Sequence, residues 1–467
     1  MHCKYDEAKD LEEHTPCVPP LKSGVFALLQ DARKRVGPPN RRAGIPKKYR
    51  VPLLFICGTI LFTCSKFQCI AIPGAVFNEL QMKWGLTPSQ VTGFGASFMY
   101  VYAVAQLFAG LFCDRYGGIR VIALGGIFFT LGSFLFSLSD NYILLCTGRG
   151  LVGLGASTFY LGLVAEAIRC FKRNYAVVIS GVIVTGYFGG IMANAPFAFA
   201  VTRSSLRSVL TCASVLTLAF YLAFLLLSGA VRKPPVRDVP FSCRTFVNVM
   251  KNRRNWNLFL FFSVHWGLFY SIQTVIGKKY LEDFCGISAD AAAAVLSATS
   301  VLSAVSGFAY VMGSRRLSNR RKPFCLLTAI VTFSVFLLLA VLTALDIRCF
   351  TPAVLYCFLA SVASLSAIVV PLIKESNAPG ETGSAVAFSS FLAYIFVAVF
   401  GNVIGGILDL FSPENAGGKL IYSRGAYLTV FGFLLVCSAA VLCWAARIKE
   451  AAPRLRGDGR SADANTA

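Results

Sequence analysis

The stretch GLFCDRYGGIR, Gly110 to Arg120, places one aspartate and two arginines between two long apolar segments. The preceding segment, Val91–Cys113, contains no charged residue, and another apolar segment begins at Val121. A charged side chain is costly inside a bilayer but is accommodated at its surface. The stretch therefore predicts a short polar loop at a membrane face, joining two membrane-spanning helices.

The composition of the whole chain is that of a membrane protein. Of its 467 residues, 56% are hydrophobic and only 14% are charged, whereas a soluble domain carries about 25% charged residues. Most of the 16 cysteines lie in apolar segments, where a thiol behaves as a small hydrophobic group. No Cys or His spacing indicates a metal site or a cofactor, and residues 1–50 contain no apolar segment typical of a signal peptide.

Twelve apolar segments are long enough to cross a bilayer. A hydrocarbon core of about 30 Å requires roughly 20 residues of helix, whereas a strand of an outer-membrane barrel has about ten residues of alternating polarity. We therefore predict an all-α integral membrane protein with about 12 transmembrane helices. The segments are Val51–Pro73, Val91–Cys113, Val121–Leu138, Tyr142–Ile168, Tyr175–Val201, Leu206–Ala230, Asn257–Ile276, Ala291–Met312, Pro323–Leu345, Thr351–Ile373, Ser384–Leu410 and Ala426–Ala446.

A polar segment, VRKPPVRDVPFSCRTFVNVMKNRRN from Val231 to Asn255, divides these helices into two groups of six. Such a division is a recurring plan in secondary transporters and predicts two pseudo-symmetric six-helix bundles. Residues 25–36 are expected to form a short amphipathic helix. The predicted parts are an N-terminal tail (1–50), a first bundle (51–230), a linker (231–255), a second bundle (256–446) and a C-terminal tail (447–467).

The distribution of lysine and arginine predicts the orientation. When the N-terminus is placed inside, most of the 44 Lys and Arg residues fall in inner segments. Positive charge accumulates on the cytoplasmic side of membrane proteins, so both termini are expected in the cytoplasm and the chain in the plasma or cell inner membrane. The net charge of +22 then indicates attraction to anionic lipid and not to nucleic acid. The eight residues assigned to outer loops are Lys83, Arg203, Arg207, Lys278, Lys279, Arg348, Lys419 and Arg424.

Two stretches resemble sequence patterns of the major facilitator superfamily. The first resembles its signature G-x-x-x-D-R-x-G-x-R/K between the second and third helices, through Gly110, Asp114, Arg115, Gly117 and Arg120. The second, GRGLVGLGAS at 148–157, resembles the fourth-helix pattern R-x-x-x-G-x-G through Arg149, Gly153 and Gly155. The resemblance extends from Val51 to Ala446 and implies a transporter of two six-helix bundles.

This resemblance implies that the loop is a conformational latch, which holds the two halves together on the cytoplasmic side in the outward-facing state. Glu166, at the inner end of the fourth helix, resembles the acidic partner of the loop arginine, and Arg149 is assigned a structural or coupling role. The alternative is that these charges only set the topology. The second half has Arg315 where the family often has Asp, so no reciprocal latch is expected there.

Ionisable side chains within membrane helices are functional by default. Lys66 lies in the first helix and His265 in the seventh, and the resemblance implies that both helices line a central cavity. Two basic groups facing one cavity would favour an anion. Alternatively, Lys66 extends to the membrane surface, and His265 carries a proton or is a packing residue. Polar neighbours proposed to complete the site are Gln68, Tyr100, Gln106, Ser271 and Gln273.

The sequence therefore predicts a secondary transporter of a small polar, anionic organic solute, working by alternating access as proton symport or anion exchange. An efflux antiporter for drugs or metabolites is the alternative, although the first helix lacks Asp and Glu and the fifth lacks the G-P-x-x-G-G pattern of antiporters. A non-transporting receptor or scaffold is a more distant one. No enzymatic set or ATP-binding loop is visible, and the expected partners are the solute, a proton or counter-anion and lipid, with the protein as a monomer.

Overall fold

The computed structural model describes residues 47–171, 174–231, 236, 244–317, 320–378, 381–416 and 419–448. Almost all of the predicted tails, the amphipathic helix expected at 25–36 and much of the predicted linker lie outside the described residues. The predicted boundaries between tail, bundle and linker therefore stay predictions.

Twelve helical spans are long and apolar enough to cross a membrane, counted over the described residues, and this confirms the predicted fold class. Each predicted segment corresponds to one span, because about 20 apolar residues are what a bilayer crossing requires. The spans are α2 (Lys47–Ala71), α4 (Pro88–Tyr116), α5 (Gly118–Leu138), α6 (Tyr142–Phe171), α7 with α8 (Tyr175–Met192, Ala195–Arg203), α9 (Leu206–Gly229), α11 with η3 and α12 (Arg253–Ser271, Ile272–Ile276, Gly277–Asp283), α13 (Ala289–Arg316), α14 (Lys322–Ala344), α15 with η4 and α16 (Thr351–Leu359, Ala360–Ser364, Ser366–Ser376), α17 (Thr382–Asp409) and α18 (Arg424–Arg447).

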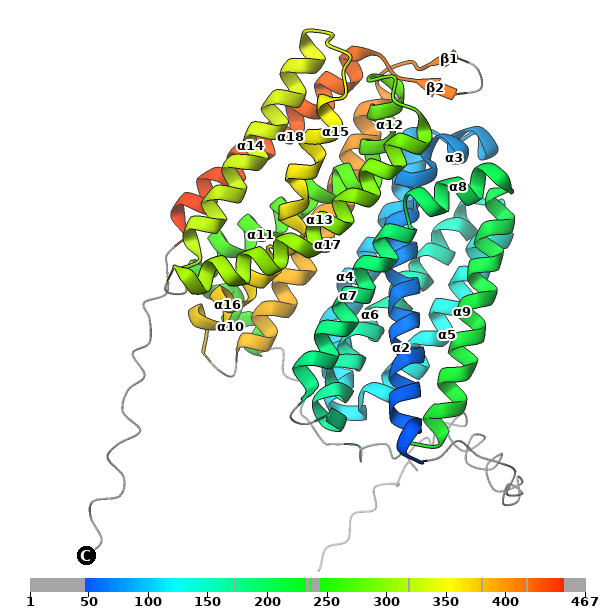
Figure 1. The fold of residues 1–467 in the computed structure, drawn as a ribbon, viewed down its shortest axis with the longest axis vertical. Coiled ribbons are helices and arrows are strands. Elements are labelled where there is room, and N and C mark those ends of the chain that lie inside the picture. The colour runs from blue at the N-terminus through cyan, green and yellow to red at the C-terminus, as the bar shows by residue number, and fades with distance from the viewer. Residues whose placement is uncertain are drawn as a thin grey trace, which may run out of the picture. The chain divides into compact units, whose positions relative to one another are not determined.

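The spans run between two faces, which are named here by what they hold. The terminal face holds the start of α2, the end of α18 and the short helix α10 (Arg244–Lys251). The hairpin face holds η1 (Gly74–Val76), α3 (Phe77–Trp84) and the antiparallel hairpin of β1 (Glu414–Ala416) and β2 (Lys419–Ile421). In Figure 1 the hairpin lies at the top and α2 begins at the bottom.

The helices from α2 to α9 are called the N-terminal half, and those from α11 to α18 the C-terminal half. Within the N-terminal half, α6 packs against both α4 and α5; within the C-terminal half, α18 packs against α14 and α11. The halves meet where α4 packs against α17 and α7 against α13. Figure 1 shows the helices of each half gathered together.

The seventh span differs from its prediction. The prediction ended the helix at Ile276 and assigned Lys278 and Lys279 to an outer loop, whereas the structure continues through the π-helical segment η3 into α12 and ends at Asp283. Both lysines lie in α12 and are buried, with 4% and 1% of their surface exposed. The prediction was wrong because two adjacent charges ended the apolar pattern, although each lysine is paired with a carboxylate four residues further along the same helix.

Candidate functional site

Lys66 lies on α2 and reaches from the N-terminal half to the C-terminal half. Its side chain is half-buried, and its Nζ donates a hydrogen bond to the hydroxyl of Tyr394 on α17 at 3.3 Å. Gly189 of α7 packs against the base of the Lys66 side chain. A Cβ at position 189 would stand 3.1 Å from the Lys66 Cβ and 2.5 Å from the Thr63 carbonyl oxygen. The missing side chain lets α7 pack directly on the base of the lysine.

The immediate surroundings of the Lys66 ammonium are aromatic. It lies 5.7 Å from the ring centroid of Phe62 and 5.9 Å from that of Tyr394. The Tyr394 ring in turn packs against Tyr102 of α4, with centroids 4.5 Å apart. No Asp or Glu forms an ion pair with Lys66 in the described part of the chain. A single positive charge therefore lies between the halves, among rings and without a protein counter-ion.

His265 occupies a different environment. Its side chain is fully buried, its Nε2 is hydrogen-bonded to Thr332 Oγ1 of α14 at 2.6 Å, and its ring packs edge-on against Phe261. These partners all belong to the C-terminal half, and no contact among the described residues joins His265 to Lys66. His265 Nδ1 is buried and has no hydrogen-bond partner in the described part of the chain, and the role of His265 stays a prediction.

The other polar candidates divide into two sets. Gln68, Ser271 and Gln273 make hydrogen bonds within their own halves, the first to Ser133 at 2.7 Å. Tyr100 accepts a hydrogen bond from Asn402 of α17 at 3.1 Å and so connects the halves. Gln106 stands one helical turn from Tyr102 on α4, and its Oε1 is buried without a hydrogen-bond donor in the described part of the chain.

Arg149 is entirely buried and closes the end of α2. It donates hydrogen bonds to the carbonyl oxygens of Gln68 at 3.0 Å and Ile72 at 3.4 Å, and its guanidinium lies over the ring of Phe98, 4.9 Å from the centroid. The last carbonyls of a helix lack partners within that helix, so Arg149 satisfies two of them. The structural or coupling role assigned to Arg149 stays a prediction.

Gly153 and Gly155 of the same pattern allow close helix packing. A Cβ would collide with the Phe98 carbonyl oxygen of α4 at the first position, and with the Gly125 carbonyl oxygen of α5 at the second. Both glycines therefore set the distance between neighbouring helices within the N-terminal half.

The loop Gly110–Arg120 makes a tight turn at the terminal face. Gly117 has φ 85°, a conformation that favours glycine. Glu166 of α6 is 2% exposed and accepts a hydrogen bond from the backbone N–H of Ile119, at the start of α5, at 3.2 Å. It also pairs with Arg169 at 2.5 Å. These two contacts of Glu166 lie within the N-terminal half.

Asp114, Arg115 and Arg120 also interact with their surroundings, and the Arg120 guanidinium donates a hydrogen bond to the Tyr116 carbonyl oxygen at 2.8 Å. Gly110 has open space around it, so its position requires no glycine on steric grounds. The latch assigned to this loop stays a prediction.

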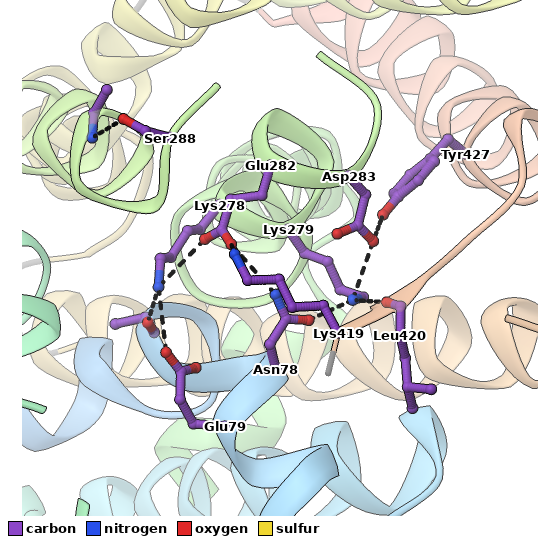
Figure 2. Close-up of polar contacts among 12 residues, drawn as sticks. Asn78, Glu79, Lys278, Lys279, Glu282, Asp283, Ser288, Lys419, Leu420 and Tyr427 are labelled. Carbon is purple, nitrogen blue, oxygen red and sulfur yellow. Dashed lines mark hydrogen bonds and ion pairs between the residues drawn. The ribbon is translucent and has the colours of Figure 1, made fainter. Parts of the chain in front are cut away.

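At the hairpin face, a group of charged residues crosses between the halves (Figure 2). Lys278 donates a hydrogen bond to the Ala75 carbonyl oxygen at 2.6 Å and pairs with Glu282 at 3.4 Å and Glu79 at 3.9 Å. Ala75 and Glu79 belong to the N-terminal half. Lys278 thus joins the halves through its own ammonium group.

Lys279 makes the second crossing in this group (Figure 2). Its Nζ donates to Asn78 Oδ1 at 2.5 Å and to the Leu420 carbonyl oxygen at 2.7 Å, and it pairs with Asp283 at 3.1 Å. Tyr427 donates a further hydrogen bond to Asp283 at 2.6 Å. The side chains of Lys279 and Asp283 are 0% and 1% exposed, so this is a buried ion pair with additional hydrogen bonds.

The group defined by Asn78, Glu79, Lys278, Lys279, Glu282, Asp283 and Lys419 is called the hairpin-face network. Its three lysines face three carboxylates, because Lys419 pairs with Glu282 at 3.1 Å. This network was not predicted from the sequence. The spacing K-K-x-x-E-D in α12 was the available signal, since it places each lysine four residues before a carboxylate, on one helical face.

The halves also make smaller contacts at this face and at the middle of the helices. Gln81 donates to the Tyr422 hydroxyl at 3.2 Å, and the backbone N–H of Ser89 donates to Asp409 at 3.3 Å. Deeper in the structure, the hydroxyls of Tyr187 and Ser364 are hydrogen-bonded at 3.2 Å. Within the described ranges, no three His, Cys, Asp or Glu side chains stand close enough together to hold a metal ion.

Comparison with known proteins is consistent with this architecture. The family model described as Major Facilitator Superfamily matches residues 54–399. The riboflavin transporter RibZ of Clostridioides difficile is 34% identical over 132 residues, which is 27% of this chain and 29% of that protein. The probable nitrate/nitrite antiporter NarK1 of Thermus thermophilus is 24% identical over 267 residues, or 51% of this chain and 55% of that protein. The chain thus spans only about a third to a half of the length of these relatives.

A solved structure shares the fold over a much greater length. The crystal structure of a bacterial homologue of the human lysosomal transporter Spinster, in an inward-facing and occupied conformation, aligns with a TM-score of 0.64. The alignment covers 87% of this chain and 98% of that one, with 16% identity. At this identity the likeness establishes the fold alone.

Proposed function

Because the chain belongs to the Major Facilitator Superfamily, we propose that it is a secondary transporter that carries a small organic anion across the membrane by alternating access. The choice of an anion rests on the charge and the surroundings of Lys66. A charged group within a membrane span is costly unless it is paired, and no protein carboxylate pairs with Lys66 among the described residues. An anionic solute supplies the missing charge.

The position of Lys66 between the halves supports this role. Its hydrogen bond to Tyr394 joins α2 to α17, and the Tyr394 ring packs on Tyr102 of α4. A solute bound here contacts both halves at once, so its binding is sensitive to how the halves are arranged. His265 is left out of the proposed binding set because its contacts lie within the C-terminal half.

The contacts between the halves support alternating access. The hairpin-face network ties the halves together at one face, whereas Glu166 at the opposite face is engaged within its own half. We assign this conformation as the one closed at the hairpin face. In the alternate conformation the network separates and the loop Gly110–Arg120 latches the terminal face, so that each state is stabilised by one set of contacts.

The orientation and surroundings follow from the charge distribution. The terminal face is assigned to the cytoplasm and the hairpin face to the outside, with the protein in the plasma or cell inner membrane. Transport is driven by a co-transported proton or by exchange for a counter-anion, with lipid as the surrounding partner and the monomer as the working unit. The direction of the driving proton or anion gradient decides whether the solute is taken up or exported.

The test is transport of radiolabelled organic anions by the full chain in proteoliposomes, with and without a pH gradient. Lys66→Gln is expected to reduce kcat/KM for anions at least tenfold, because the solute then binds without its counter-charge. Lys83→Gln is the matched control, since Lys83 is an exposed lysine at the hairpin face. Solute placed on either side of the membrane distinguishes uptake from efflux.

Normal anion transport by Lys66→Gln would falsify the assignment of Lys66. Transport of uncharged or cationic solutes alone would overturn the choice of anion. Thermal unfolding of both variants checks that each is folded, so that a loss of transport reports on binding.

A further inference from the structure

We infer that the site around Lys66 selects aromatic monocarboxylates over aliphatic carboxylates of the same size and charge. The inference rests on the proposed function, because it specifies the anion that the Lys66 site binds. It is carried by the side chains around the ammonium group, which are aromatic rings contributed by both halves.

Two rings lie next to the ammonium itself. The centroids of Phe62 and Tyr394 are 5.7 Å and 5.9 Å from the Lys66 Nζ, and the Tyr394 hydroxyl accepts its hydrogen bond. Ring faces attract a cation at this distance, so they stabilise the charge of Lys66 in place of a carboxylate. A ligand carboxylate that binds the ammonium is therefore brought within reach of aromatic surface.

The aromatic surface continues away from the ammonium in two directions. Tyr102 packs on Tyr394 with centroids 4.5 Å apart and planes inclined at 60°, and Tyr160 packs on Phe62 at 5.5 Å and 34°. The rings thus form a connected series from α6 through α2 and α17 to α4.

The C-terminal half adds a second aromatic face. Tyr270 of α11 packs on Trp266 with centroids 5.1 Å apart. The indole Nε1–H of Trp266 is buried and has no acceptor in the described part of the chain. A buried donor without an acceptor is unfavourable, and an oxygen substituent of a bound ligand would satisfy it.

The physical chemistry of these groups favours a flat, conjugated ligand. Aromatic rings pair in offset-stacked or edge-to-face geometry and gain more than the burial of their area, a gain that a saturated ring of equal size does not receive. The charge of the ligand is also limited by the site. Lys66 is a single cation, so a second carboxylate on the ligand would be buried without a partner, at high cost.

The experiment compares three probes in proteoliposomes containing the full chain: benzoate, cyclohexanecarboxylate and benzamide. The two acids have the same charge and similar size but differ in aromaticity, whereas benzamide keeps the ring and lacks the charge. We expect kcat/KM for benzoate to exceed that for cyclohexanecarboxylate by about two- to tenfold. Benzamide is expected to be carried poorly, by the same charge argument as for Lys66→Gln.

Variants assign this preference to the rings. Tyr394→Leu should bring the ratio of benzoate to cyclohexanecarboxylate transport close to one, whereas Tyr394→Phe, which keeps the ring, should preserve it. Phe62→Leu is a second variant for the case that Tyr394→Leu does not fold. Phe308→Leu is the matched control, because Phe308 on α13 is 68% exposed.

The outcomes separate this inference from the function on which it rests. Equal transport of the two acids, both dependent on Lys66, overturns the aromatic preference and leaves anion transport standing. An unchanged ratio in both Tyr394→Leu and Phe62→Leu also overturns it. If neither acid is carried while other organic anions are, the inference fails and anion transport stands; if only uncharged or cationic solutes are carried, both fail.

Discussion

The charged groups at the two faces of the molecule are arranged differently. At the hairpin face, Lys279 joins Asn78, 201 residues away, and its ion pair with Asp283 is almost fully buried. At the terminal face, Glu166 contacts Arg169, three residues further along the same helix, and the backbone of Ile119. The bond from Lys279 to Asn78 depends on where the two halves are, whereas the contacts of Glu166 depend only on the fold of one half.

This difference shows which charges can sense the transport state. Contacts across the halves must break when the halves rearrange, so their free energy contributes to the balance between states. Contacts within a half persist in both states and contribute to folding alone. Lys279 makes both kinds of contact, because it donates to Asn78 across the halves and pairs with Asp283 within its own helix.

The largest expected effect comes from breaking the buried pair of the hairpin-face network. Lys279→Met leaves Asp283 buried without its cation and should lower the free energy of unfolding by about 3–5 kcal/mol. The double variant Lys279→Met/Asp283→Leu removes both charges and should recover most of that loss. Thermal unfolding of the purified protein in detergent measures both.

The matched control for this pair is Lys419→Met. Its side chain is 49% exposed and pairs with Glu282, so the loss should stay below about 1 kcal/mol. If the double variant is no more stable than Lys279→Met, the unpaired charge of Asp283 is not the cause of the loss.

An effect of intermediate size on stability is expected when one glycine at each face is replaced by alanine. In Gly118→Ala, the new Cβ collides with the Gly162 carbonyl oxygen and lies 2.8 Å from Glu166 Cγ, all within the N-terminal half. The helices cannot separate there without unfolding, so we expect a loss of about 1–3 kcal/mol in stability.

In Gly405→Ala, the new Cβ instead meets Thr92 and, at 2.9 Å, the Cα of Ser89, across the interface of the halves. Opening the hairpin face relieves this collision, so the thermal stability should change less than in Gly118→Ala. Transport should slow, because the conformation closed at the hairpin face becomes less favourable. Equal losses of stability in the two variants would show that the halves cannot separate at Gly405.

The smallest effect is expected for a charge pair within one half at the hairpin face. Arg207 pairs with Asp140, and a hydrogen bond from Trp84, followed by one from Arg207, lowers the pKa of Asp140 below its usual value. A lowered pKa adds stability above the unfolded-state pKa of about 3.9 and loses it as the pH falls through the folded-state pKa. Asp140 is exposed, so the contribution is small.

Asp140→Asn should therefore leave transport unchanged. The small difference in melting temperature from the wild type should be constant between pH 5 and pH 8, and should shrink only below about pH 4. A clear change in transport would contradict the rule that pairs within a half do not set the transport state.

The fold was predictable because bilayer thickness constrains the sequence. Each span needs about 20 apolar residues, and the twelve segments read from hydropathy correspond to the twelve helical spans. The prediction failed at Lys278 and Lys279, where the helix continues to Asp283. Two charges can stay in a membrane helix here because Glu282 and Asp283 neutralise them from the same helix. Ala75 and Asn78, about 200 residues earlier, supply further acceptors that no local pattern reveals.

The candidate site was predictable only in part. Lys66 could be identified because a lone cation in an apolar segment is rare. Its partner Tyr394 could not, because the two are 328 residues apart in a chain that holds 17 tyrosines. His265 illustrates a further limit: α11 is apolar on all sides, so the sequence does not indicate which side faces α14 and Thr332 and which faces the other half.

The segment η3, Ile272–Ile276, helps to determine the direction in which the lysines of the hairpin-face network point. A π-helical turn holds one more residue than an α-helical turn would, as the bond from the Gly277 N–H to the Ile272 carbonyl oxygen shows. If the same residues wound as a continuous α-helix, everything beyond η3 would rotate by about 100°. Lys278 and Lys279 would then turn away from Ala75 and Asn78 with every charge retained, so the backbone form of η3 specifies this closure as much as amino-acid type does.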